Sequence, residues 1–258
     1  MRARSRAPRH LALLPALLAL SAVAWLVTSQ LADPDMRLGI LTGTGGGSMA
    51  EAAMPFDRLL AVSLFMATWT LMMVAMMFPA VAPVVMMFDR WAQSKARPRS
   101  VTAAFLGGYL AVWSVIGFAA YAVVVALQAL VPAGDPNAER VGGALLAAAG
   151  LYEMTPLKDL CLRHCRSAMG IVMQYADRLA DGHRGPFRVG LVHGLYCVGC
   201  CWSLMVVLVL LGMMNLVWMG LVASVIFAEK VLPGGVLLSR ITGIVLIGVG
   251  LILAVGPR

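Results

Sequence analysis

Long apolar runs separated by short charged segments make up most of the chain. A helix that crosses the hydrocarbon core of a bilayer needs about 20 mostly apolar residues, and the runs reach or approach that length. They cover approximately residues 11–30, 58–80, 103–131, 138–155, 188–212, 215–231 and 235–256. An outer-membrane barrel would instead show short segments of alternating hydropathy. The pattern therefore predicts an all-α fold, a polytopic transmembrane helical bundle with about seven spans.

Two interruptions of this pattern affect where the helices are expected to end. The residues from Gly212 to Asn215 are the only break between the fifth and sixth runs. Without it these runs would form one helix of more than about 40 residues, so we predict a tight hairpin there. Pro79 and Pro83 lie near the end of the second run. Because proline lacks the backbone N–H that a helix uses, we predict that they break this helix.

The basic residues fall on alternate sides of the predicted spans. With the N-terminus in the cytoplasm, every Lys and Arg lies in a cytoplasmic segment except Arg37, Arg58, Arg140 and Arg258. Such an excess of cytoplasmic Lys and Arg is typical of inner-membrane proteins. We therefore predict a cytoplasmic N-terminus and a location in the bacterial inner (cytoplasmic) membrane. The net charge of +8 then needs no nucleic-acid partner, because no soluble face collects the charges.

The first 57 residues divide into two predicted parts. Residues 1–30 form an N-terminal anchor helix, although their arginines, apolar stretch and Ala22-Val23-Ala24 also resemble a cleavable signal peptide. The apolar run continues through Trp25, Leu26 and Val27, which favours a retained anchor. Residues 31–57 form a Gly-rich extracytoplasmic loop, and residues 58–258 form the membrane helical bundle. With 61% hydrophobic and 12% charged residues, the chain is not an ordinary soluble enzyme.

All five cysteines lie toward the predicted cytoplasmic side. Thiols stay reduced in that compartment, which leaves metal ligation, redox chemistry or plain packing as their roles. The fifth run places four candidate ligands on one helical face, within an arc of about 100°: His193, Cys197, Cys200 and Cys201. The preceding cytoplasmic segment carries three more, at the spacing that shares a face if this segment is helical: Cys161, His164 and Cys165.

Methionines near the cytoplasmic end of the second run bear on the choice of metal. The candidate thioether ligands are Met73, Met76 and Met77, although methionine in such a stripe also serves as plain packing. Thiolate and thioether ligands together favour Cu(I), whereas Cys and His alone suit zinc equally well. We therefore predict a Cu(I) site, with zinc as the alternative metal.

Two acidic residues close predicted helices in the same neighbourhood. Glu153 ends the fourth run and Glu229 the sixth. Ionisable residues inside a membrane helix suggest function, but at helix ends they also reach the interface. We expect both carboxylates to support the structure or the ligands rather than to bind metal.

Three stretches resemble a bacterial family of uncharacterised, predicted metal-binding integral membrane proteins, known as a domain of unknown function. They are Trp69–Pro79, Tyr152–Ser167, and His193–Trp202 with Met213–Leu216 and Glu229–Lys230 downstream. The resemblance covers roughly residues 55–235. It implies a protein embedded in the lipid bilayer that binds a metal ion.

Three functions are consistent with these residues. The first, which we favour, is a copper-handling membrane protein, either a transporter or a membrane metallochaperone that passes Cu(I) to a protein partner. The pair Cys197 and Cys200 also has the CxxC spacing of a thiol–disulfide electron carrier. The third is a scaffold subunit whose thiols only pack. The sequence contains no Ser-His-Asp arrangement that we recognise and no His-Glu-x-x-His motif, so we predict that the protein is not an enzyme.

Overall fold

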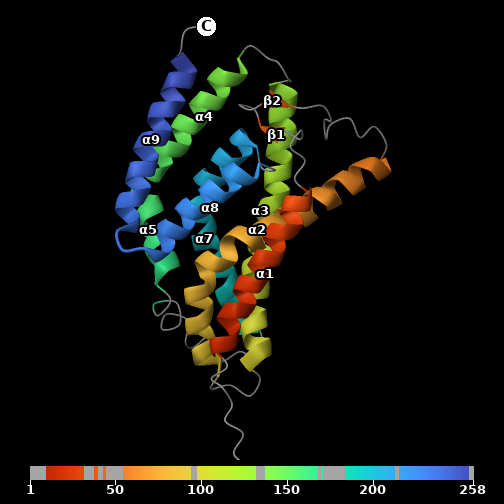
Figure 1. The fold of residues 1–258 in the computed structure, drawn as a ribbon, viewed down its shortest axis with the longest axis vertical. Helices are drawn as coiled ribbons and strands as arrows, with labels where there is room; N and C mark the ends of the chain where they lie inside the picture. The colour runs from red at the N-terminus through yellow and green to blue at the C-terminus, as the bar shows by residue number, and fades with distance from the viewer. Residues whose placement is uncertain are drawn as a thin grey trace, which may run out of the picture.

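A computed structural model describes residues 10–31, 38–39, 43–44, 55–93, 98–131, 137–167, 170, 184–212 and 215–255. The described chain is helical apart from a two-residue antiparallel pairing of β1 (Leu38–Gly39) with β2 (Gly43–Thr44). The helices are α1 (His10–Leu31), α2 (Pro55–Ala92), α3 (Pro98–Leu130), α4 (Ala138–Glu153), α5 (Pro156–Arg166), α7 (Arg184–Leu211), α8 (Leu216–Val231) and α9 (Gly235–Val255) (Figure 1). Each of the seven apolar runs forms a helix, and the prediction of an all-α helical bundle is confirmed.

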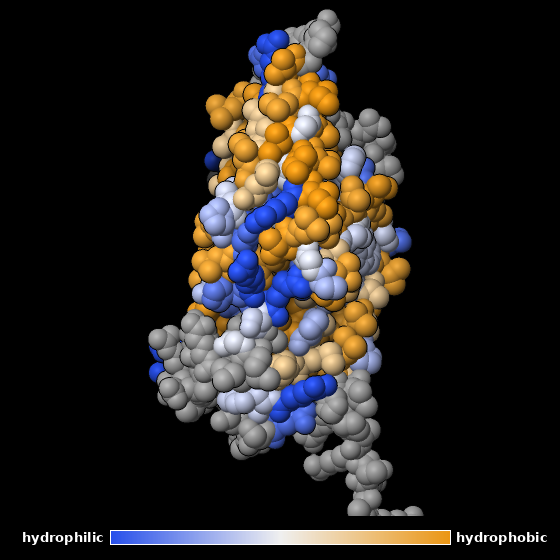
Figure 2. Space-filling model, turned by 90° about the vertical axis from the view of Figure 1, so that its left-hand side faces the viewer, coloured by the Kyte–Doolittle hydropathy of each residue, from blue (hydrophilic) through white to orange (hydrophobic). Residues whose placement is uncertain are grey.

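Five of the described helices are long and apolar enough to cross a membrane. They are Ala12–Leu31, Arg58–Ala92, Arg99–Leu127, Arg184–Leu211 and Gly235–Val255. The other two apolar helices, α4 and α8, have 16 residues each, which corresponds to about 24 Å of helix. Much of the surface in Figure 2 is apolar, and α9 alone exposes Leu237, Ile244 and Ile252. These features suit a protein in contact with lipid, while seven spans remain a prediction.

Helix α2 runs through both of its prolines, so the prediction that they break it was wrong. Pro79 and Pro83 lie inside its 38 residues. Pro79 has no N–H to offer the carbonyl of Ala75 one turn earlier, and Ser21 of α1 takes its place with a hydrogen bond of 2.7 Å. A neighbouring helix thus satisfies the carbonyl that proline frees. The helix changes direction along its length (Figure 1) instead of ending.

The predicted hairpin between the fifth and sixth runs is confirmed. Gly212 follows α7 with a φ of 106°, a conformation that side-chain-bearing residues rarely adopt. Asn215 then caps α8, because its side-chain oxygen accepts hydrogen bonds from the backbone N–H groups of Val217 at 3.0 Å and Trp218 at 3.2 Å. One long helix is therefore excluded.

Helices α4 and α9 pack closely through facing glycines. A Cβ atom on Gly143 would lie 2.6 Å from the carbonyl oxygen of Gly250, and one on Gly150 would lie 2.6 Å from that of Gly243. Small residues allow helix backbones to approach in lipid, as the Gly and Ala content of α4 suggests. The short helix α5 follows α4 after Thr155, whose side chain accepts a hydrogen bond from the Lys158 N–H. This turn directs α5 against α7 and α8.

Candidate metal centre

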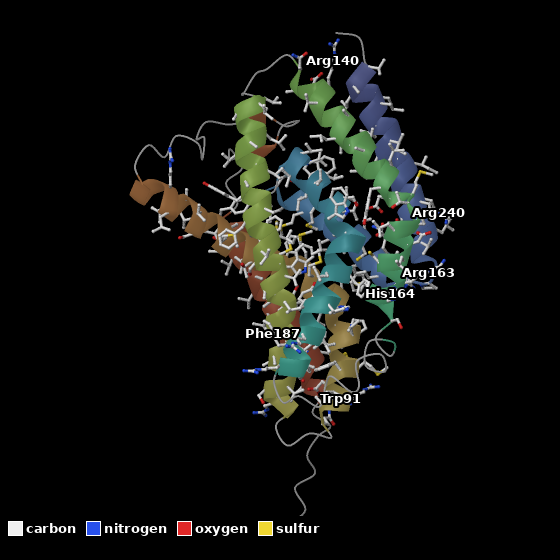
Figure 3. The ribbon with its side chains drawn as sticks, turned by 180° about the vertical axis from the view of Figure 1, so that it is seen from behind. Trp91, Arg140, Arg163, His164, Phe187 and Arg240 are labelled. Atoms are coloured by element: carbon white, nitrogen blue, oxygen red, sulfur yellow. The ribbon has the colours of Figure 1, made fainter. Side chains whose placement is uncertain are left out.

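Helix α7 carries the central group of candidate ligands on its buried face. His193, Cys197, Cys200 and Cys201 are each at most 1% exposed, as the shared helical face requires. The thiols of Cys200 and Cys201 donate hydrogen bonds to the carbonyl oxygen of Cys197 at 3.1 and 2.9 Å. Figure 3 shows sulfur atoms gathered in the interior between α3 and α7. The predicted face of the fifth run therefore points into the protein and not into lipid.

The thiol of Cys197 has polar partners from two other helices. The hydroxyl of Tyr109 in α3 lies 3.2 Å from its Sγ. The ammonium of Lys230 in α8 donates a hydrogen bond of 3.0 Å to the same atom. Both partners are buried, so this sulfur is enclosed by protein among polar groups, a cluster that we call the sulfur pocket.

Helix α5 brings its two cysteines against α7. Hydrogen bonding with Cys197 and Cys200, together with burial, raises the pKa of the Cys165 thiol well above its ordinary value. Cys161 lies at Gly199, where a Cβ atom would be only 2.7 Å from the Cys161 Sγ. Burial and the neighbouring Cys200 raise the pKa of Cys161 as well. The glycine therefore makes room for a thiol from another helix, and the cysteines of α5 and α7 lie together.

Lys230 extends the group to the methionines of α2. Its Nζ lies 3.8 Å from the Met77 Sδ and 4.0 Å from the Cys201 Sγ, in addition to its hydrogen bond with Cys197. Met73 and Met76 are buried in the same core as the cysteines. Of the three candidate thioethers, Met77 is thus the one placed at the ammonium.

A second buried polar group lies beside the thiols. Lys158 of α5 forms ion pairs of 2.7 Å with Glu153 and 2.9 Å with Glu229, and both carboxylates and the ammonium are almost completely buried. Burial disfavours the charged lysine, but Glu229 and Glu153 outweigh it and raise the pKa of Lys158. Ser203 of α7 and Ser239 of α9 also donate hydrogen bonds to Glu153. This network links α4, α5, α7, α8 and α9, as expected for supporting carboxylates.

His193 is buried without a hydrogen-bond partner. Neither ring nitrogen is bonded among the described residues, and the ring packs beside Phe105 at 5.8 Å and Tyr109 at 5.9 Å between centroids. Buried polar atoms are normally satisfied. An unbonded imidazole four residues from Cys197 is therefore available as a ligand.

His164 lies elsewhere. Its ring stacks on Tyr196, with centroids 4.6 Å apart, and its Nδ1 bonds the carbonyl of Leu160 at 2.9 Å. It is only partly buried and lies between α5 and α7 (Figure 3). The structure thus separates His164 from the pocket around Lys230.

Sequence reasoning missed Lys230, Lys158 and Tyr109 as members of the site. Lys230 lies at the end of an apolar run, and a lysine in such a run is itself a signal for a buried role. Nothing in the sequence pattern marks Tyr109. Its part depends on the packing of α3 against α7.

The described residues contain no ready-made group of three or more His, Cys, Asp or Glu side chains that would hold a metal ion. The Cys200 and Cys201 thiols instead point at a backbone carbonyl, and Cys197 bonds Lys230. The donor types nevertheless match a soft ion, because thiolate and thioether sulfur prefer Cu(I). Two unbonded imidazole nitrogens add a further donor.

Comparison with known families bears on the choice of metal. The model of the PpoB2 family, described as copper chaperone, matches residues 66–253. The chain belongs to this copper chaperone family. The match contains every candidate ligand and Lys230, and it confirms the resemblance to a metal-related family. Neither the curated proteins nor the solved structures give a match. The copper chaperone description supports copper and gives zinc no support.

Proposed function

We propose that this copper chaperone family member binds Cu(I) inside the membrane and passes the ion to a partner protein. One observation carries the proposal: thiols of α5 and α7 meet a thioether of α2 in a buried pocket. These segments are distant in sequence, so their sulfur atoms come together only through folding. Cu(I) is the ion that prefers such sulfur ligands.

The geometry supports a particular ligand set. Cys197 and Cys201 lie on one face of α7, and Cys165 approaches them from α5. Met77 supplies a thioether, and His193 supplies an imidazole that has no other described partner. Cu(I) binding requires the Cys201 side chain to turn from the Cys197 carbonyl toward the pocket. The remaining candidate sulfur ligands lie in the same buried core: Cys161, Cys200, Met73 and Met76.

Membrane placement is also part of the proposal. The distribution of Lys and Arg supports seven spans, a cytoplasmic N-terminus and the bacterial inner membrane. With this orientation, the first turns of α7 and all of α5 lie toward the cytoplasm. The Cu(I) pocket is then closer to the cytoplasmic surface than to the opposite one.

A chaperone role suits the site better than conduction. Transport across the bilayer needs a succession of sites, whereas the described thiols form one group. Acquisition and delivery require a single site that exchanges its ion with a partner. We also propose that the protein is not an enzyme, because its distinctive groups are soft ligands and not a nucleophile with an aligned base.

Metal analysis of detergent-purified protein tests the proposal. Cells are supplied with both copper and zinc, and we expect copper to copurify with the wild type. Cys197→Ser combined with Cys201→Ser should remove it. Met77→Leu should weaken binding, whereas Met154→Leu is the matched control because Met154 is exposed at the end of α4. No copper above background in the wild type would contradict the proposal.

Thiol trapping in cells separates the other two functions. Oxidised Cys197 and Cys200 that respond to redox partners would favour the electron carrier. An unchanged cellular phenotype after replacement of all five cysteines by serine would favour the scaffold. A copper chaperone predicts reduced thiols and loss of copper handling in that variant.

A further inference from the structure

The ammonium of Lys230 has an unusual set of neighbours. Its hydrogen-bond partners among the described residues are all sulfur atoms, at 3.0 Å for Cys197, 3.8 Å for Met77 and 4.0 Å for Cys201. A buried ammonium normally pairs with carboxylate or carbonyl oxygen. Lys158 of α5, for example, pairs with two carboxylates. The sulfur pocket therefore already holds a univalent cation, which belongs to the protein itself.

An alternative partner for this ammonium is close by. The Oε1 of Glu229 is buried and has no hydrogen-bond partner among the described residues. Its other oxygen, Oε2, bonds Lys158. Lys230 is near enough for its charge to act on the Glu229 carboxyl. An ammonium that leaves the sulfur atoms thus has an open acceptor.

The charges of the surrounding network also fit an internal cation. In their ionised forms, Glu153 and Glu229 carry two negative charges against the one positive charge of Lys158. Lys230 supplies the charge that balances them. An unpaired buried charge is costly. The excess negative charge of the two carboxylates therefore favours a Lys230 ammonium that stays at or beside the sulfur atoms when no metal ion is bound.

We propose that the Lys230 ammonium occupies the Cu(I) position in the ion-free protein and moves to the Glu229 carboxyl when Cu(I) binds. The inference rests on the proposed function. The hydrogen bond to the Cys197 Sγ is given up and one to the Glu229 Oε1 is made. The cysteines bind the metal ion as thiolates, and each thiol that joins the site releases its proton to solvent. The reverse movement returns the ammonium to the sulfur atoms and assists release of the ion to a partner.

Replacement of Lys230 tests the role of its charge. Ag(I) is a suitable probe because it is a soft univalent ion like Cu(I) and does not change oxidation state in air. Lys230→Leu removes the competing cation, so we expect Ag(I) affinity to rise about tenfold or more. Release to a soluble thiol chelator should slow by a similar factor. Lys230→Arg restores a cation and should return both values toward those of the wild type.

Lysine NMR on the wild type gives a second measurement if Lys230→Leu does not fold. In protein labelled with ¹⁵N-lysine, Ag(I) should shift the ammonium signal of Lys230 most. Lys158 is the internal control, because its two carboxylates hold it away from the sulfur atoms.

The outcomes separate the two proposals. Absence of Ag(I) and Cu(I) binding by the wild type would overturn the proposed function, and this inference with it. If the wild type binds the ion and Lys230→Leu binds it equally well or more weakly, the proposed function stands and only the proposed role of the Lys230 ammonium is overturned. The same holds if the Lys230 signal does not move on loading.

Discussion

Ser21 and Ala75 are joined by a hydrogen bond of 2.7 Å between helices α1 and α2. The acceptor is the backbone carbonyl that Pro79, one turn later, cannot bond. The serine therefore satisfies the acceptor that Pro79 leaves free, and α2 continues through this residue. It also fixes α1, which lies outside the segment matched by the family.

Ser21→Ala should destabilise the protein by about 1 kcal/mol, a value near the upper range of interhelical hydrogen bonds in membranes, because it leaves a buried carbonyl unbonded. Unfolding in mixed detergents measures this loss. Ser224→Ala is the control, since Ser224 is exposed and bonds only the carbonyl of its own helix at Gly220. Equal losses in the two variants would mean that the interhelical bond contributes nothing.

The helices were predictable because a long continuous run of apolar residues is a local signal for a helix. The continuous α2 was not predictable in this way. A proline removes one hydrogen bond from its helix, and the freed Ala75 carbonyl finds its partner in Ser21, more than fifty residues away in the chain. Local pattern carries no information about that partner.

The cysteine positions predicted a shared buried face for a similar reason. Spacings of three and four residues fix which side chains of one helix share a face, and the four candidate ligands of α7 are all buried. The contribution of α8 was missed, because Lys230 joins α7 and α2 through tertiary packing. His164 shows that a suitable spacing does not by itself bring a side chain to the site. Its spacing from Cys161 is suitable, but its ring stacks on Tyr196.

Lys158→Met should lower the free energy of unfolding by about 3–5 kcal/mol, because it leaves two buried carboxylates without their shared cation. Arg240→Gln is the matched control. Arg240 also pairs with a carboxylate, Asp159 at 3.2 Å, but its side chain is 56% exposed, and surface pairs contribute about 1 kcal/mol or less. Chemical unfolding in detergent distinguishes the two.

A compensated variant checks the origin of that loss. Lys158→Met combined with Glu153→Gln and Glu229→Gln removes the charges together, so part of the stability should return. If the triple variant is less stable than Lys158→Met alone, charge imbalance is not the cause.

Gly199→Ala should cost about 1–3 kcal/mol, the usual range for overpacking, because the added methyl group would meet the Cys161 Sγ at 2.7 Å. Displacement of α5 should also make Cys161 react faster with a thiol reagent. Gly248→Ala is the control, since nothing lies within 4 Å of a Cβ atom there. Similar thiol reactivity in both variants would show that α5 tolerates the methyl group.

His193→Phe should affect stability and metal binding in opposite directions. The buried imidazole has two nitrogens without a hydrogen bond to the described part of the chain, so an apolar ring should leave the ion-free protein equally stable or stabilise it by about 1 kcal/mol. Loss of a ligand should weaken Ag(I) affinity about tenfold or more. His164→Phe is the matched control: it keeps a ring beside Tyr196 but loses the bond to Leu160, so it should lower stability slightly and leave Ag(I) affinity unchanged. The reverse assignment, with affinity lost only in His164→Phe, would place the metal ion beside His164, where α5 meets Tyr196 of α7.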